Sequence, residues 1–174
     1  MLNKHGVLLA MSAALSVAGC QPSESPRKAA TGQVQANDAD RAFIDAMVPH
    51  HEMAFMMADD ALAKAKHAEI KTFAQKVKRD QTREIDQMKQ YRQQWFGSNA
   101  TPPMDHSQMK SMAAGPDFDS MWSEEMIKHH QSAIDMANRA LTAAARPETK
   151  ALAQQMIDAQ KKEQDQLRAW IKVW

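Results

Sequence analysis

The second half of this chain repeats the first, and the duplication restricts how the chain can fold. The dipeptide His50-His51 recurs as His129-His130, at a displacement that needs no gap over residues 38–95 and 117–174. Roughly a third of the positions in these two segments are identical at that displacement. The repeat predicts two copies of one unit, packed together as a single domain over residues 38–174.

Each copy has the composition and apolar spacing of two helices. Ala, Met, Gln, Lys and Glu dominate, glycine is absent from both copies, and apolar residues recur at helical intervals. In the first copy this predicts helices over residues 40–66 and 69–95, and Arg146-Pro147 marks the corresponding turn of the second copy. Two tandem antiparallel hairpins of this length predict an all-α fold, a four-helix bundle.

The core-facing stripe of the first helix carries both histidines. At about 100° per residue, His50 and His51 flank a stripe of Met and Ala side chains that points inward. In the second helix, Gln81 and Glu84 lie in the middle of the apolar stripe. A buried carboxylate is unfavourable unless it is paired or bound to a metal, so Glu84 needs a partner in the other helix.

The turn near residues 66–69 decides which residues face each other. Antiparallel partners should have numbers that add up to about 135, which places His51 opposite Glu84 and Met47 opposite Met88. Each hairpin therefore brings Met, His, His and Glu to one level of the core. Two interpretations stay open: a ligand site, or a buried His–Glu pair that fixes the register amid methionines that fill the core. In the second copy the corresponding pairs are His130 with Glu163 and Met126 with Leu167.

Pro49 stands directly before the histidine pair. Because proline has no N–H, it should kink the first helix, unless it occupies the first turn of a separate helix. The second copy has Lys128 at this position, so the duplicated unit does not require the proline.

Methionine and histidine also gather in the linker between the copies, residues 96–116. Pro102-Pro103 and Gly115-Pro116 bound it. Thioether and imidazole ligands select Cu(I), and imidazole also suits Cu(II), so we expect a relay that loads or unloads the bundle; sequence drift in a tolerant loop is the alternative. If both hairpin turns point the same way, this linker crosses only one end of the bundle. Its candidate ligands are Met104, His106, Met109 and Met112.

The chain begins like an exported lipoprotein. Residues 1–19 read as a signal peptide, and "VAGC" at 17–20 resembles a lipobox, which implies cleavage before Cys20 and lipidation of its thiol. A non-lipidated signal or an N-terminal anchor is the alternative. Residues 20–37 read as a flexible tether. The predicted location is the cell envelope or periplasm, with a lipid anchor in the membrane. Cys20 is the only cysteine, so soft ligands in the domain must be methionines.

The charge of the chain points to no polyanionic partner. Lys and Arg number 22, and Asp and Glu number 21. We therefore expect no nucleic-acid binding.

The paired segments "DAMVPHHEMAFMMADDAL" and "FDSMWSEEMIKHHQSAIDMANRAL" resemble the doubled signature of an exported bacterial domain-of-unknown-function family with a ferritin-like bundle. Some members of that family are copper-binding proteins tied to copper tolerance. The resemblance implies copper ligation by four residues of the first copy and their equivalents in the second; Met53 and Met56 have no methionine equivalents. The implied ligands are Met47, His50, His51 and Met57 with Met126, His129, His130 and Met136.

These patterns together predict an extracytoplasmic copper-binding protein that buffers, stores or delivers Cu(I) or Cu(II), with a copper-transfer protein as a possible partner. The candidate ligands also include Glu84, Met88, Glu163 and the linker residues. Two alternatives stay open. One is a ferritin-like di-metal oxidase, although such sites use Glu-x-x-His motifs that this chain lacks. The other is a metal-free structural or interaction bundle.

Overall fold

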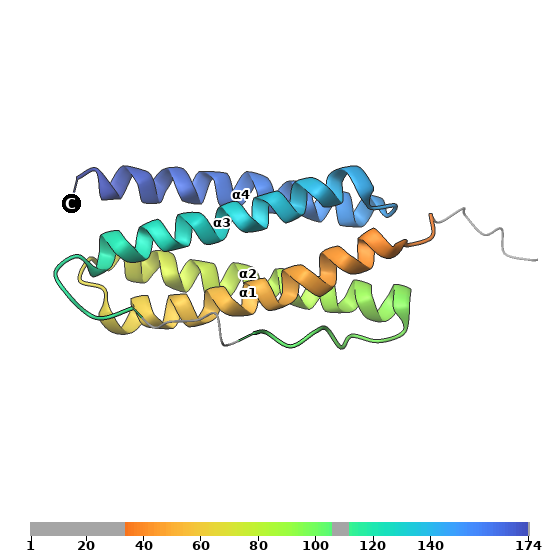
Figure 1. Ribbon diagram of the computed structural model, residues 1–174, viewed down its shortest axis with the longest axis horizontal. Helices are drawn as coiled ribbons and strands as arrows, with labels where there is room; N and C mark the ends of the chain where they lie inside the picture. The colour runs from red at the N-terminus through yellow and green to blue at the C-terminus, as the bar shows by residue number, and fades with distance from the viewer. Residues whose placement is uncertain (1–33, 106–111, 174) are drawn as a thin grey trace, which may run out of the picture. The chain divides into compact units, whose positions relative to one another are not determined.

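The computed structural model describes residues 34–105 and 112–173, and the helices among them form one bundle (Figure 1). The predicted all-α, four-helix fold is confirmed, and the helix bounds differ from the predicted ones by a few residues. The signal peptide, Cys20, His106 and Met109 lie outside the described residues. The helices are α1 (Asp38–Lys64), α2 (Ala68–Phe96), α3 (Phe118–Ala143) and α4 (Pro147–Ile171).

Local chemistry explains where the helices begin and end. Asn37 caps α1 through a capping box, because its side chain accepts from the N–H of Asp40 while its own N–H donates to the Asp40 carboxylate. Gly97 ends α2 with a φ of 77°, a left-handed conformation that favours glycine. Pro147 begins α4, where its missing N–H costs no helical hydrogen bond.

Pro49 lies inside α1, which is one helix from Asp38 to Lys64. The interpretation of Pro49 as the first-turn proline of a separate helix is therefore wrong. Pro49 removes one backbone hydrogen bond in the turn that carries His50 and His51.

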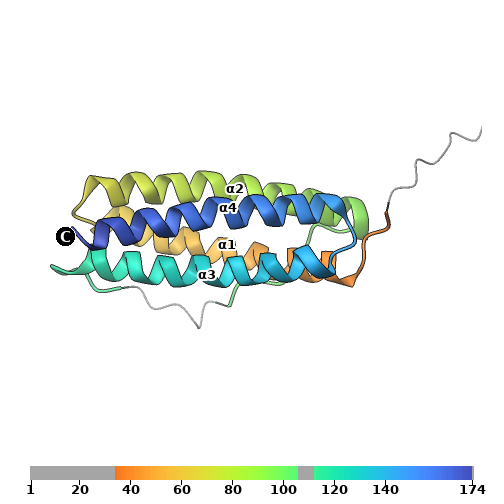
Figure 2. The ribbon, with the colours of Figure 1, turned by 90° about the horizontal axis from the view of Figure 1, so that it is seen from above.

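The two hairpins pack with their turns at opposite ends of the bundle (Figures 1 and 2). Asp119, in the first turn of α3, accepts the backbone N–H groups of Lys66 and His67, so α3 begins where α1 ends. Asp40, in the first turn of α1, accepts the N–H groups of Ala145 and Arg146. Asp40 and Asp119 are equivalent positions of the repeat, so each hairpin closes the turn of the other.

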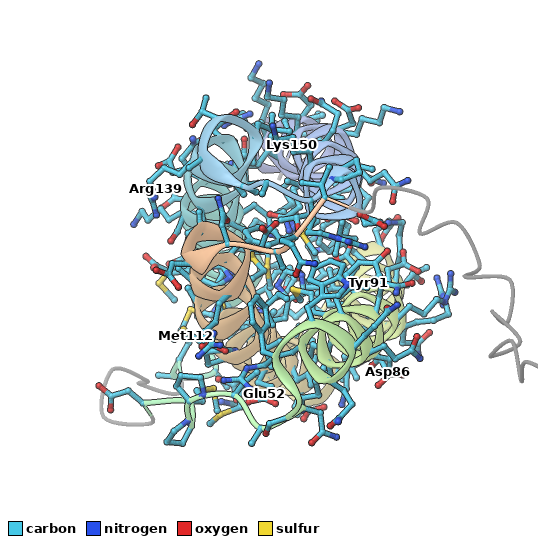
Figure 3. The ribbon with its side chains drawn as sticks, turned by 90° about the vertical axis from the view of Figure 1, so that its right-hand side faces the viewer. Glu52, Asp86, Tyr91, Met112, Arg139 and Lys150 are labelled. Atoms are coloured by element: carbon cyan, nitrogen blue, oxygen red, sulfur yellow. The ribbon has the colours of Figure 1, made fainter. Side chains whose placement is uncertain are left out.

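This arrangement overturns the predicted path of the linker. Because α2 ends at the opposite end of the bundle from the start of α3, the connection between them must travel the length of the bundle instead of crossing one end (Figure 1). One long crossover of this kind is typical of ferritin-like topology. Residues Asn99–Pro103 line a surface pocket with Glu52 of α1 and Lys89 of α2, and Glu52 is visible beside this segment in Figure 3.

The core has two apolar clusters with a polar layer between them. One cluster contains Met47 and Met88, and the other contains Met126 and Leu167, together with Phe118 and Trp122. The layer between the clusters consists of the two histidine pairs and the four polar side chains opposite them. We call it the histidine layer: His50, His51, Gln81, Glu84, His129, His130, Gln160 and Glu163. Among the described helices, none is long and apolar enough to cross a membrane.

Candidate metal centre

The predicted His–Glu pairs are present in both hairpins. His51 Nε2 lies 2.7 Å from Glu84 Oε2, and His130 Nε2 lies 2.8 Å from Glu163 Oε2. Both histidines have no exposed side-chain surface, whereas the Glu84 side chain is 22% exposed and that of Glu163 10%. The antiparallel register inferred from the turn is therefore correct at the level of the histidines.

The other histidine of each pair joins the two hairpins. The rings of His50 and His129 stack with their centroids 3.8 Å apart, and His129 Nε2 lies 3.0 Å from the carbonyl oxygen of His50. Each of these rings also lies 6.2 Å, centroid to centroid, from its neighbour in sequence, His51 or His130. The antiparallel contact of α1 with α3 thus collects four imidazoles in the middle of the bundle.

The Nδ1 atoms take no part in these contacts. His51 and His129 hydrogen-bond through Nε2 to oxygen acceptors, which places a proton on each of these nitrogens, and His130 Nε2 lies 2.8 Å from Glu163 Oε2. The Nδ1 atoms of all four histidines are buried and have no hydrogen-bond partner among residues 34–105 and 112–173. A carboxylate on one ring nitrogen with a free lone pair on the other is how proteins orient histidine toward a metal.

Burial keeps the histidines at the hairpin contact neutral. It lowers the pKa of His50 to about 3, and the charges of His51 and His130 act in the same direction. Burial also lowers the pKa of His129 well below its ordinary value, again with the other three histidines adding to the effect. Their lone pairs are therefore available at neutral pH, as metal binding requires.

Glu163 is ionised although it is buried, because two neighbouring side chains stabilise its charge. Burial alone would raise its pKa, but the contacts with His130 and Lys76 outweigh burial, and the pKa is lowered. The layer thus combines neutral imidazoles with a carboxylate anion.

The predicted methionine ligands do not share the level of the histidines. Met47 precedes the His50-His51 pair by about one helical turn, roughly 5 Å along the axis. Met47 and Met88 belong to the first apolar cluster, and Met126 belongs to the second. Because the hairpins run in opposite directions, the methionines of the two copies flank the layer on opposite sides. Met57 and Met136 are partly buried at the cluster edges.

The two linker methionines that the structure describes, Met104 and Met112, are partly buried. Met112 packs against the second apolar cluster, so part of its side chain fills space in the core as well as offering a thioether (Figure 3). Its N–H donates to Asp60 and its carbonyl accepts from Lys64. Met104 is half-buried. Met56 of α1 is 39% exposed, consistent with its having no methionine equivalent in the second copy.

Sequence reasoning placed Gln81 in the core without giving it a role in the site. Gln81 is 4% exposed and its repeat equivalent, Gln160, is 3% exposed. Gln81 Oε1 and both amide atoms of Gln160 have no hydrogen-bond partner in the described part of the chain. Their identity at equivalent positions of the repeat was the signal that they belong to the layer.

The side chains are not arranged around a preformed metal position. Within residues 34–105 and 112–173, no group of three or more His, Cys, Asp and Glu side chains has the spacing to hold an ion. The stack of His50 on His129, with ring planes inclined by 30°, contributes to this: a ring nitrogen binds a metal in the plane of its ring, so stacked rings do not direct their lone pairs to a common point. Chelation by both requires one ring to turn.

Comparison with known families then identifies the chain. The family described as Domain of unknown function (DUF305) matches residues 10–92 and 96–171. The chain belongs to the DUF305 family. This confirms the resemblance read from the doubled Met-His-His segments. Comparison with curated proteins finds no match.

Solved structures place the bundle among relatives that hold metal. CopM in the apo form is 41% identical with a TM-score of 0.70, over 78% of this chain and 97% of that one. CopM in the Cu(I)-bound form is 40% identical with a TM-score of 0.69, over 78% and 96%. CopM in the Cu(II)-bound form is 37% identical with a TM-score of 0.69, over 78% and 97%.

A more distant DUF305 structure supports the fold alone. The DUF305 fragment from Deinococcus radiodurans is 23% identical with a TM-score of 0.64, over 80% of this chain and 99% of that one. None of these four structures is described as an enzyme.

Proposed function

We propose that this DUF305 protein binds copper at the histidine layer and buffers, stores or delivers it outside the cytoplasm. The observation that carries the proposal is the set of four buried Nδ1 atoms without a hydrogen-bond partner in the described residues. A buried polar atom without a partner is unfavourable, and a metal ion would satisfy it. The copper-bound forms of CopM support copper as that metal.

The donor chemistry fits a soft cation. Neutral imidazole binds both oxidation states of copper, and thioether selects Cu(I). Met47 and Met126 lie one turn from the histidines on either side of the layer, within reach of an ion that moves along the bundle axis. In this proposal Glu84 and Glu163 orient His51 and His130 from behind instead of binding copper directly.

Capture of copper includes a change in the layer. The ring of His50 or His129 turns out of the stack so that its Nδ1 atom and a neighbouring imidazole face the same ion. The loss of one stacking contact is small beside the bonds that the ion forms. The change also explains how a densely packed core accepts and releases its cargo.

The di-metal oxidase fits these side chains less well. Iron and manganese in such bundles are held by several carboxylates, whereas the layer contains two, each in contact with a histidine. A purely structural role accounts for the two His–Glu pairs but gives no reason for the buried, unpaired Nδ1 atoms.

A competition titration with Cu(I) tests the proposal. The full chain is titrated against a chromogenic Cu(I) chelator, together with His50→Ala/His51→Ala and His129→Ala/His130→Ala. Met121→Leu, which removes a 44% exposed methionine of α3, is the matched control. We expect both histidine variants to lose affinity by at least about tenfold, the lower range for altering a metal's surroundings. Equal affinity in all four proteins refutes the site, and circular dichroism checks that each variant folds.

The location outside the cytoplasm is part of the proposal. It rests on the lipobox-like "VAGC" ending at Cys20, with lipid attachment to the cell envelope membrane. Cell fractionation of the parent and Cys20→Ser tests it: the parent should sediment with membranes and the variant should not. A parent protein found only in the soluble periplasmic fraction contradicts the anchor.

A further inference from the structure

A small cavity of about 30 Å³ lies between α2 and α4. The cavity lies on the side of the bundle away from the contact between α1 and α3. At that contact the stack of His50 on His129 closes the histidine layer. Figure 3, which looks along the bundle, shows α2 and α4 next to each other on the side opposite α1 and α3. The volume is about that of one small ion or water molecule.

The cavity connects the surface with the histidine layer. Its wall includes Ala159, which is exposed, and Gln81 and Gln160, which are buried with amide atoms that lack a partner in the described residues. Glu84 and Glu163 also line it, and these carboxylates contact His51 and His130 directly. Most of the residues that line the cavity next to the histidine layer thus carry oxygen atoms that can bind a cation.

One cation already stands at the mouth of the cavity. The Lys76 Nζ atom lies 2.5 Å from Glu163 Oε1 and 3.0 Å from Asp80 Oδ2. Burial lowers the pKa of Lys76, but its hydrogen bonds to Glu163 and Asp80 outweigh burial and raise the pKa, so the side chain is charged. The repeat does not require this ammonium, because the equivalents of Lys76 and Asp80 are Gln155 and Ala159.

We propose that the cavity between α2 and α4 is the entrance through which copper reaches the histidine layer, and that the Lys76 ammonium keeps it closed by occupying the cation position between Asp80 and Glu163. This inference rests on the proposed function and names the route to that site. An arriving cation must displace Lys76, whose side chain is 44% exposed and can swing into solvent. Glu163 Oε1 is then free to make a transient first contact, before the ion moves on to the imidazoles.

The gate makes a prediction about rates that a structural salt bridge does not. Lys76→Gln removes the charge without adding a thioether, and glutamine is the residue at the equivalent position, Gln155, so copper should enter faster. Lys76→Arg keeps the charge and should behave like the parent. Lys162→Gln removes an exposed lysine of α4 beside Glu163 in sequence, and it controls for the change in net charge.

The experiment is stopped-flow transfer of Cu(I) from a chromogenic chelator to the full chain. We expect Lys76→Gln to take up copper about threefold to tenfold faster, at the low end of the range by which local charge alters association rates. Added salt should reduce this difference, because salt screens exposed charges. Lys76→Arg and Lys162→Gln should match the parent, and melting curves confirm that all three variants fold.

Two results overturn the gate. If all proteins bind copper and Lys76→Gln takes it up at the parental rate, copper does not pass Lys76, while the proposed function stands. If Lys162→Gln accelerates uptake as much as Lys76→Gln, the effect is one of net charge and the cavity is not the entrance. A parent protein that binds no copper refutes the proposed function and the entrance together.

Discussion

The buried histidines should make the metal-free protein less stable in mild acid, and His50 allows the effect to be isolated. In the unfolded chain His50 has its ordinary pKa of 6.5, whereas in the folded protein the pKa is lowered to about 3. Between these values the unfolded chain binds a proton that the folded protein does not. The free energy of unfolding therefore rises with pH over this window, and falls as the pH drops below 6.5.

The magnitude at pH 5 depends mainly on the unfolded pKa. At that pH His50 is still neutral in the folded protein. In the unfolded chain it is protonated, because pH 5 lies about 1.5 units below its ordinary pKa of 6.5. At about 1.4 kcal/mol per pH unit, this single group should cost about 2 kcal/mol between pH 7.5 and pH 5. The figure hardly changes if the folded pKa is one unit higher. His129 acts in the same direction, because its pKa is also lowered.

Urea unfolding of the full chain at pH 7.5, 6 and 5, with a chelator that removes metal, measures the effect. His50→Gln replaces the imidazole with a neutral amide that does not titrate, so the fall in unfolding free energy between pH 7.5 and pH 5 should shrink by about 2 kcal/mol. His129→Gln should reduce the fall as well. A fall that is the same in parent and His50→Gln would show that His50 is protonated in the folded state, and would refute the argument from burial.

Three further predictions concern the hairpins and the linker. Glu163→Gln weakens contacts with both His130 and Lys76 and should lower the free energy of unfolding at pH 7.5 by about 1–3 kcal/mol. Glu84→Gln should lower it by less, because the Glu84 side chain is 22% exposed; equal losses would contradict this ranking. Asp119→Asn and Asp40→Asn should each cost about 1–3 kcal/mol in urea unfolding, because each carboxylate accepts backbone N–H groups of the opposite hairpin's turn; unchanged stability would show that these bonds do not hold the hairpins together. Changing Met104, Met109 and Met112 to Leu and His106 to Ala should slow copper transfer to a chelator in stopped flow while the core retains its copper, and unchanged kinetics would remove the relay.

The sequence was sufficient for the His–Glu pairing within each hairpin. The helical period, the turn position and the antiparallel register follow from local spacing, so the pairing of His51 with Glu84 was predictable from residue numbers alone. The second copy repeated the same local rules, which is why the pairing of His130 with Glu163 was correct as well.

The sequence did not determine how one hairpin packs on the other. Nothing in the spacing of Asp40 and Asp119 indicated that each carboxylate would accept the N–H groups of the other hairpin's turn. That exchange sets the turns at opposite ends of the bundle and sends the linker along its length. The predicted path of the linker was wrong because it assumed the other packing.

What the sequence determined is thus the content of the histidine layer, and what only the tertiary structure decided is its geometry. The residue types and their helical faces are local properties, fixed by a period of about 3.6 residues. The stack of His50 on His129, the unpaired Nδ1 atoms and the cavity behind Lys76 depend on contacts between residues roughly 80 positions apart. Two apolar helix faces can bury each other in several ways, and the packing of the whole bundle determines which of these forms.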